Sequence, residues 1–321
     1  MYLTRKTGEM EKILEIKNLY VGRIDGTKIL PVLNNIELSI YKGELFCLVG
    51  ESGSGKTTLA LSIIRLLPKS FRILSGEIIL CNKKITGISE ELIRGLRGKF
   101  VSMIFQDPGA YLDPLFNIDT HLRESFHGNP VEFNQLKIKV ITEVGLSPEI
   151  LSVYPHQLSG GQQQRVLIAM ALINNPSIII ADEPTTALDV LTTKQIIKLL
   201  DQIRIKHNPG MLFITHDLNL ALSTGTRIGI MYRGCIVEIF KPNKEKPLHP
   251  YTKILMGYSE ENHSDISDTT LMDTKQETEE KCIFFERCPE KKPLCNRKVD
   301  FIWRDETTGI RCIKYGQNSQ M

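Results

Sequence analysis

A glycine-rich segment followed by Lys and Thr is suited to holding phosphate groups. Residues 50–57 read Gly-Glu-Ser-Gly-Ser-Gly-Lys-Thr and fit the pattern G-x-x-x-x-G-K-[ST]. Glycines let backbone N–H groups turn toward phosphate oxygens at the positive N-terminus of a helix. Lys56 is expected to reach the β- and γ-phosphates, and Thr57 to ligate Mg²⁺. The pattern therefore predicts a nucleotide site made by Gly50, Glu51, Ser52, Gly53, Ser54, Gly55, Lys56, Thr57 and Thr58.

Two adjacent carboxylates follow a second signal, the apolar run of residues 177–181. At the C-terminal end of a buried strand, Asp182 and Glu183 would lie in the crevice where parallel α/β sheets bind ligands. Asp182 is suited to the magnesium shell, and Glu183 to polarising an attacking water. Taken alone, the segment is equally a strand that ends in two solvated acids. Beside the phosphate loop, the hydrolytic interpretation is favoured.

These residues need a strand and a helix on either side to position them. The phosphate loop follows the apolar run Leu45–Val49 and precedes a helical stretch, Lys56–Leu67. Without both, it would be a turn that only packs a helix on a sheet. Residues 211–215 form another apolar run, and helical patterns at 162–173 and 193–205 precede the later runs. Buried strands that alternate with helices predict a parallel α/β sheet, preceded by alternating strands at 13–18 and 36–40.

Composition limits the class of protein. Lys plus Arg is 40 and Asp plus Glu is 37, so a net charge of +3 argues against nucleic-acid binding through bulk positive charge. The longest apolar run, Val166–Ile173, is far shorter than the ~20 residues of a membrane-spanning helix. Residues 1–12 lack an apolar signal core. We expect a cytoplasmic chain that reaches a membrane only through a partner.

The chain is expected to divide into a core, a linker and a tail. Residues 108–158 carry helical pattern, notably at 132–145, and predict a helical insertion in the α/β core. Residues 259–280 are rich in Asp and Glu with few large apolar residues, which is typical of a flexible acidic linker. The tail, residues 281–321, is too short to build a core alone and needs a metal or a docking surface.

The segment Leu158-Ser-Gly-Gly-Gln-Gln-Gln-Arg165 completes a set of motifs. With the phosphate loop, Gln106, Asp182-Glu183 and His216, it strongly resembles the ATP-binding subunit of ATP-binding cassette (ABC) transporters. The resemblance implies a nucleotide-binding domain over residues 1–258, with a parallel α/β core, an antiparallel β subdomain and a helical subdomain at about 108–158. It also implies that the signature contacts the γ-phosphate of ATP held by another subunit through Ser159, Gly160, Gly161 and Gln162.

The resemblance assigns catalytic roles to three residues. Glu183 would polarise water, His216 would hold the γ-phosphate and position Glu183, and Gln106 would touch Mg²⁺ or water. Magnesium itself would be held by Thr57, Gln106 and Asp182.

Two further positions take roles from the same resemblance. Asp189, in Ala187-Leu-Asp189, matches the D-loop aspartate that communicates across the dimer. Arg23 stands where the family normally has an aromatic side chain that stacks on adenine. A guanidinium plane can also stack on a ring, so Arg23 is expected to contact the base, with Tyr20 nearby.

The tail carries the subfamily signal. Leu248-His-Pro-Tyr-Thr252 and the later cysteines look like the oligopeptide/dipeptide/nickel importer branch. Their spacing, C-x5-C-x6-C-x16-C, lacks the tight pair of most zinc sites and suits an iron–sulfur cluster. Some members of the branch carry a [4Fe–4S] cluster on such a pattern; zinc and free thiols are the alternatives. The expected structural ligands are Cys282, Cys288, Cys295 and Cys312, with an apolar shell of Phe284, Phe285, Phe301 and Trp303.

The resemblance implies an ATPase that energises import on the cytoplasmic side of a cell membrane. Its partners would be two permease subunits, a second and related ATP-binding subunit and, indirectly, a solute-binding protein; no nucleic acid is expected. Di- or oligopeptides are the first expectation for the cargo, with nickel and oligosaccharide as alternatives. A soluble non-transport ABC ATPase and a metal-sensing regulator are other classes. Because hydrolysis does not use the tail, Cys288→Ser is expected to spare nucleotide binding and to loosen the tail.

Overall fold

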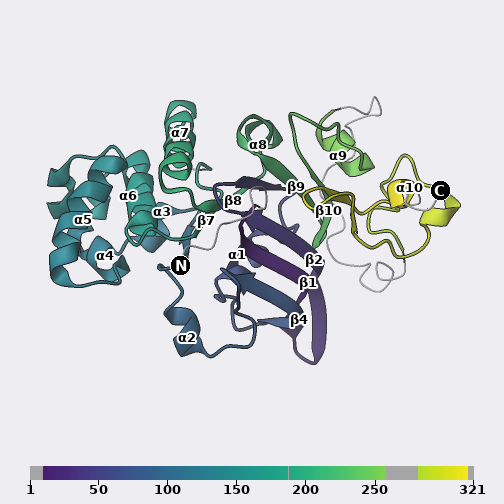
Figure 1. Cartoon of the computed structure of the whole chain (residues 1–321), viewed down its shortest axis with the longest axis horizontal. Coiled ribbons are helices and arrows are strands. Elements are labelled where there is room, and N and C mark those ends of the chain that lie inside the picture. Colours follow the sequence, from purple (N-terminus) through teal and green to yellow (C-terminus); the bar gives the residue numbers. More distant parts are fainter. Residues whose placement is uncertain (1–9, 187, 258–280, 317–321) are drawn as a thin grey trace, which may run out of the picture.

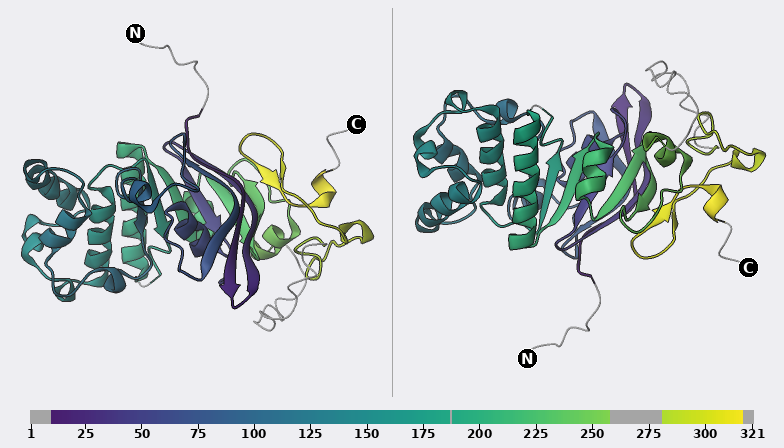
Figure 2. Two further views of the ribbon diagram at one scale, coloured as in Figure 1. Left: turned by 90° about the horizontal axis from the view of Figure 1, so that it is seen from below. Right: turned by 90° about the horizontal axis from the view of Figure 1, so that it is seen from above.

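The structure is a computed structural model of the 321-residue chain, and it describes residues 10–186, 188–257 and 281–316. The predicted acidic linker, residues 259–280, lies outside the described residues. Two sheets form the centre, a group of helices lies at one end, and the C-terminal segment lies at the other (Figures 1 and 2). None of the described helices is long and apolar enough to cross a bilayer.

The larger sheet has eight strands in the order β11-β12-β10-β9-β3-β8-β7-β6. Its central strands β9, β3, β8, β7 and β6 are parallel, and β10, β12 and β11 add to one edge in antiparallel fashion. The strands are β3 (Leu45–Val49), β6 (Val101–Ile104), β7 (Ile178–Asp182), β8 (Gly210–Thr215), β9 (Arg227–Tyr232), β10 (Cys235–Phe240), β11 (Ile302–Trp303) and β12 (Gly309–Ile310). The predicted parallel α/β core is therefore present, within a sheet of mixed direction.

The smaller sheet is antiparallel, with the order β2-β1-β4-β5. Its strands are β1 (Lys12–Asp25), β2 (Lys28–Tyr41), β4 (Phe71–Leu80) and β5 (Lys83–Lys84). The two segments predicted as strands from alternation, 13–18 and 36–40, lie within β1 and β2. Both strands run longer than predicted because the alternation is interrupted where their register shifts.

Continuous apolar runs form the central strands because both faces of the larger sheet are covered. In β3, Phe46 and Leu48 face the core shared with the smaller sheet, whereas Cys47 and Val49 face the core shared with the helices. The helix α1 (Lys56–Ile63) packs in the first of these cores through Leu59 and Ile63. It ends before the predicted Leu67 because Arg65 takes a left-handed φ of 56°.

The helices between residues 108 and 224 cover the other face of the larger sheet and extend to one end (Figure 1). The helix at residues 90–94 instead packs through Ile93 in the core shared with the smaller sheet, and the last helix lies at the other end of the molecule (Figure 1). Residues 108–158 hold helices of 4 to 14 residues and 3₁₀ turns, and the prediction of helical structure there is confirmed. The elements are α2 (Glu90–Arg94), α3 (Pro108–Tyr111), α4 (Ile118–Ser125), α5 (Pro130–Glu143), η1 (Pro148–Ser152), η2 (Pro155–Gln157), α6 (Gly160–Leu172), α7 (Val190–His207), α8 (Leu218–Thr224), α9 (Pro250–Leu255), η4 (Pro293–Cys295) and α10 (Ile313–Gly316).

The C-terminal segment docks on the core. Strand β12 pairs with β10, so that Ile310 lies opposite Glu238. The buried guanidinium of Arg311 donates to the carbonyl oxygens of Asn35, Ile236 and Val299 at 3.0–3.3 Å. The buried Arg311 and the carbonyl groups that it satisfies fix this segment on both sheets. The two sheets therefore provide the docking surface that so short a segment needs.

Candidate functional site

The phosphate loop connects β3 to α1, and two of its glycines, Gly50 and Gly55, stand where a side chain would clash or be strained. A Cβ on Gly50 would lie 2.2 Å from the carbonyl oxygen of Met231, and Gly55 has a φ of +106°. The Lys56 ammonium donates to the carbonyl oxygens of Gly50 and Glu51 at 2.8 and 3.0 Å. Burial lowers the pKa of Lys56, and the nearby carboxylates of Glu183, Asp182 and Glu51 oppose that shift. The loop is thus preformed, with the Lys56 ammonium held against its backbone.

Asp182, at the end of β7, has the properties of a magnesium ligand. It is 4% exposed, and its Oδ1 is buried with no hydrogen-bond partner among the described residues. Burial raises its pKa, the Thr57 hydroxyl lowers it, and the neighbouring Glu183 raises it. A buried carboxylate oxygen without a partner is costly unless a cation or donor completes it. The residues present therefore fit Mg²⁺, with oxygen ligands from Asp182 and Thr57.

Three side chains converge on one oxygen of Glu183. Its Oε2 lies 3.2 Å from Nδ1 of His216 and accepts hydrogen bonds from Nε2 of Gln106 at 3.4 Å and from the Thr186 hydroxyl at 2.8 Å. Glu183 follows β7, Gln106 follows β6 and His216 follows β8, so the carboxyl ends of three adjacent parallel strands meet here. The three residues predicted to be catalytic are together in the structure.

The backbone of Glu183 is itself unusual. Its φ is +46°, in the left-handed region, and its N–H donates to the carbonyl oxygen of Ile214 on β8. A non-glycine residue in this region costs about 1 kcal/mol or more and persists only where its surroundings hold it. The turn directs the carboxylate toward Gln106 and His216 rather than along the strand.

The signature residues open α6. The Ser159 hydroxyl accepts from the N–H of Gln162, and the Gln162 side chain accepts from the N–H of Ser159, a reciprocal capping box. A Cβ on Gly161 would lie 2.7 Å from the Thr192 side chain, so glycine lets α6 approach α7. Ser159, Gly160 and Gln162 are exposed, which leaves this helix N-terminus open to a ligand or partner.

The two other predicted site residues have local partners. Asp189 caps α7 by accepting from the N–H groups of Leu191 and Thr192 and from the Thr192 hydroxyl. Arg23 lies on β1 with its guanidinium 4.0 Å from Asp25, and its side chain is 46% exposed. The structure thus gives Asp189 a capping role and leaves the Arg23 side chain accessible.

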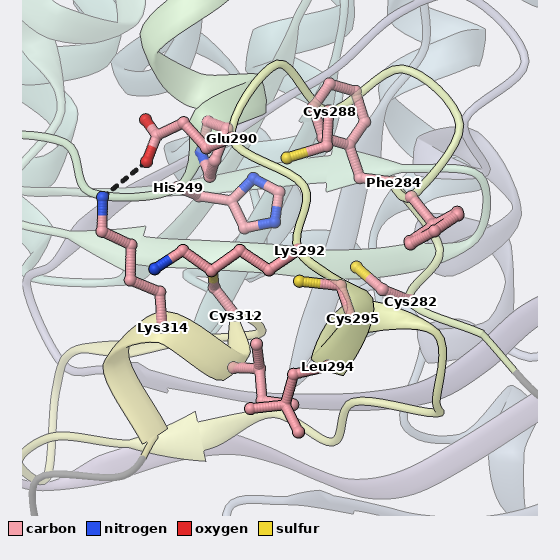
Figure 3. Close-up of a pocket in the computed structure, with 13 residues that line it drawn as sticks. His249, Cys282, Phe284, Cys288, Glu290, Lys292, Leu294, Cys295, Cys312 and Lys314 are labelled. Atoms are coloured by element: carbon pink, nitrogen blue, oxygen red, sulfur yellow. Dashed lines mark hydrogen bonds and ion pairs between the residues drawn. The ribbon is translucent and has the colours of Figure 1, made fainter.

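The four cysteines of the tail line one cavity of about 160 Å³ together with His249 and Phe284. Figure 3 shows the sulfur atoms of Cys282, Cys288 and Cys295 turned toward a common space. Burial raises the pKa of Cys288 to about 11, and electrostatic repulsion from the neighbouring Cys282, Cys312 and Cys295 adds to the increase. No group of three or more His, Cys, Asp or Glu side chains among the described residues is arranged to hold a metal ion.

The predicted apolar shell around the cysteines is only half right. Phe284 and Phe285 line the cavity. Phe301 and Trp303 instead pack on the core beneath the smaller sheet, and the Trp303 indole donates to Glu37 at 2.7 Å. They lie elsewhere because β11, which holds Trp303, pairs with β12 and so joins the larger sheet.

Sequence reasoning missed two polar residues of the site. Thr186 reaches Glu183 only because of the left-handed turn, which no spacing predicts. Arg287, from the cysteine segment, donates to the Glu51 carboxylate of the phosphate loop. The two residues are 236 positions apart, and an exposed Arg beside cysteines gives no signal for such a contact.

The preformed phosphate loop and the clustered Gln106, Glu183 and His216, on this pair of sheets, define an ATP-hydrolysing cassette. The chain belongs to the ABC transporter family and is its ATP-binding subunit. The ABC transporter family model matches residues 33–186, and the model for the oligopeptide/dipeptide transporter C-terminal region matches residues 238–295.

Relatives and solved structures agree with this assignment. The chain is 38% identical to a dipeptide transport ATP-binding protein of Bacillus subtilis over 90% of both chains. It is 35% identical to an oligopeptide transport ATP-binding protein of the same organism, over 95% of this chain and 98% of that one. A dimeric ATP-binding cassette in a post-hydrolysis state, bound to ADP and phosphate, superposes with a TM-score of 0.63 at 31% identity, over 71% of this chain and 98% of the other.

Proposed function

We propose that the chain energises a binding-protein-dependent importer of di- or oligopeptides. The observation that carries this proposal is the C-terminal region, which matches the oligopeptide/dipeptide transporter model and docks on the cassette. The two Bacillus subtilis relatives, named for dipeptide and oligopeptide transport, cover nearly the whole chain. Nickel or oligosaccharide import and a non-transport ABC ATPase have no such support here.

The site suggests how the residues divide the work. Lys56 and the loop N–H groups bind the β- and γ-phosphates, and Thr57, Asp182 and Gln106 would hold Mg²⁺, which neutralises phosphate charge. Glu183 accepts a proton from the attacking water, since its carboxylate lies at the end of β7 beside the loop.

Two further groups complete the reaction. His216, bonded to Glu183, holds the γ-phosphate and orients the carboxylate. The exposed signature N-terminus of a second cassette supplies N–H groups to the same phosphate.

Arg23 is proposed to bind the base. Its side chain, on β1, is 46% exposed, and its guanidinium plane stacks on adenine.

The helical part is proposed to dock on permease subunits at the cytoplasmic face of the membrane. Beyond Gln106, the side chains of Tyr111, Leu115 and Phe116 are 48%, 80% and 43% exposed. Exposed apolar residues grouped in sequence mark a surface that a partner covers. A second ATP-binding subunit would pair through the signature, and a solute-binding protein would deliver the cargo to the permeases.

The cysteine cavity is proposed to hold a [4Fe–4S] cluster with a structural role. The support for this proposal is that four thiols line one cavity, the number of ligands that such a cluster takes, and zinc is the alternative. The described structure does not arrange three of them as metal ligands, so binding would have to draw the thiols together. The residues beyond the linker, 281–321, would then form a small unit stabilised by the cluster. Anaerobically purified protein should contain about four irons with acid-labile sulfide. One zinc per chain would support the alternative, and neither metal would refute both.

Transport is tested by reconstitution. The chain, its permeases and the second ATPase are placed in vesicles with a solute-binding protein, and ATP hydrolysis is measured. Peptide-loaded binding protein should stimulate hydrolysis, and Lys56→Ala should abolish it because the phosphates lose their cation. Stimulation by nickel or oligosaccharide, with none by peptide, would overturn the choice of cargo but leave the ATPase intact.

A further inference from the structure

A contact between distant parts of the chain joins the cysteine segment to the phosphate loop. Arg287, next to the cavity residue Cys288, donates to both carboxylate oxygens of Glu51 at 3.3 and 3.4 Å. Its Nη1 also donates to the Tyr232 hydroxyl at 3.5 Å, and its guanidinium lies 5.6 Å from the centre of that ring. Tyr232, at the end of β9 in the core, fixes where the guanidinium lies, so the contact with Glu51 is directed.

Glu51 transmits this contact to the phosphate-binding lysine. Its side chain accepts from Arg287, and its backbone carbonyl accepts from Lys56 at 3.0 Å. The Glu51 charge is also among those that raise the pKa of Lys56 against burial, so the two side chains interact electrostatically. A change in the position or charge of Glu51 is therefore felt where the β- and γ-phosphates bind.

The charge of Glu51 is unfavourable for ATP binding unless a cation offsets it. The triphosphate brings several negative charges to the loop that holds Glu51, and like charges at this range repel. On another side, Glu51 faces the buried and neutral hydroxyl of Tyr251, whose pKa is raised by burial and then by this carboxylate. Arg287 supplies the neutralising cation from outside the cassette motifs.

We propose that Arg287 is a positioning residue for ATP: it neutralises Glu51 and holds the phosphate loop ready for the triphosphate. Because Arg287 adjoins Cys288, the affinity for ATP then depends on how well the cysteine segment is ordered. The tail is in this sense part of the nucleotide site. The proposal concerns the ATP site alone and holds whether the cavity binds iron, zinc or no metal.

The first test measures the Kd of Mg-ATP for the full-length chain by calorimetry. Arg287→Ala should raise Kd about two- to fivefold, the range expected for a half-exposed ion pair. Arg287→Lys should largely restore the affinity, and the difference should shrink at high salt. In the assembled transporter, KM for ATP should rise while kcat stays unchanged. Lys291→Ala is the matched control, since this cation of the same segment lies over the Phe285 ring and should leave Kd unchanged.

The second test separates positioning through Glu51 from simple loosening of the tail. In a Glu51→Gln background the carboxylate charge is gone, so Arg287→Ala should have no further effect on Kd. An equal rise of Kd in both backgrounds would overturn the proposal, because Arg287 would then act without Glu51. An unchanged Kd for Arg287→Ala in the native background would overturn it as well.

Discussion

A single carboxylate oxygen organises the catalytic residues. Gln106, Thr186 and His216 come from three different segments, yet all bond to Oε2 of Glu183. In the proposed mechanism, the same carboxylate accepts the proton of the attacking water. Family resemblance predicts Gln106 and His216 at this place, whereas Thr186 comes from the turn geometry alone.

Replacing Glu183 by Gln should separate ATP binding from hydrolysis. The amide keeps the shape of the side chain but cannot accept a proton, so kcat should fall about 10²–10⁴-fold. Binding of ATP should persist, because Lys56 and the loop are untouched. Single-turnover hydrolysis and Kd for Mg-ATP provide the measurement. Hydrolysis at the wild-type rate would show that Glu183 is not the base.

Replacing Thr186 by Val should weaken the orientation of Glu183. Val keeps the volume of Thr and removes the hydroxyl that donates at 2.8 Å. A hydrogen bond to a charged group that is partly open to solvent suggests a fall in kcat of about three- to tenfold, with KM for ATP unchanged. Thr186→Ser, which keeps the hydroxyl, is the control and should retain activity. Equal losses in both variants would argue for a steric role instead.

At the scale of elements, the sequence alone predicts the central strands, because a strand buried on both faces is a continuous apolar run. The runs that became β3, β7 and β8 are apolar throughout because helices and the smaller sheet cover both sides. The strands β11 and β12 have two residues each and show no periodic pattern. Their place depends on Arg311 and on the backbone carbonyls of Asn35 and Ile236 in distant segments, and no local signal encodes such contacts.

The sequence also gives no local signal for the contact between the cysteine segment and the phosphate loop, and this contact changes the prediction for Cys288→Ser. From sequence, Cys288→Ser should spare nucleotide binding; the contact of Arg287 with Glu51 now argues otherwise. Loss of Cys288 should loosen residues after 280, increase their cleavage by protease and raise Kd for ATP about as much as Arg287→Ala does. The double variant Cys288→Ser/Arg287→Ala should have the same Kd for ATP as either single variant, because both changes remove the same contact. Normal affinity together with increased cleavage would show that Arg287 stays in place without the cavity.

The whole molecule has its helical part and its cysteine segment at opposite ends of the sheets (Figure 2). The phosphate loop and the Glu183 cluster lie on the central strands between them. Gln106 lies just before the helical part and bonds to Glu183, and Arg287 joins the tail to Glu51 of the phosphate loop. Both ends of the molecule are therefore connected to the nucleotide site by side-chain contacts.

The last prediction concerns assembly, because one chain leaves its signature open. Ser159 and Gly160 are exposed, and beside the D-loop Val190 and Leu191 are 71% and 72% exposed. Apolar side chains this open at a helix start are expected to be covered when two cassettes enclose ATP. Without nucleotide the chain should be a monomer that hydrolyses ATP slowly.

Glu183→Gln with Mg-ATP should then shift toward twice the mass in light scattering, since ATP is bound but not consumed. The matched control is Glu183→Gln combined with Lys56→Ala, which should stay monomeric because it cannot hold the phosphates. A dimer that forms without nucleotide would contradict the prediction, because its interface could not depend on ATP bridging the loop of one subunit and the signature of the other.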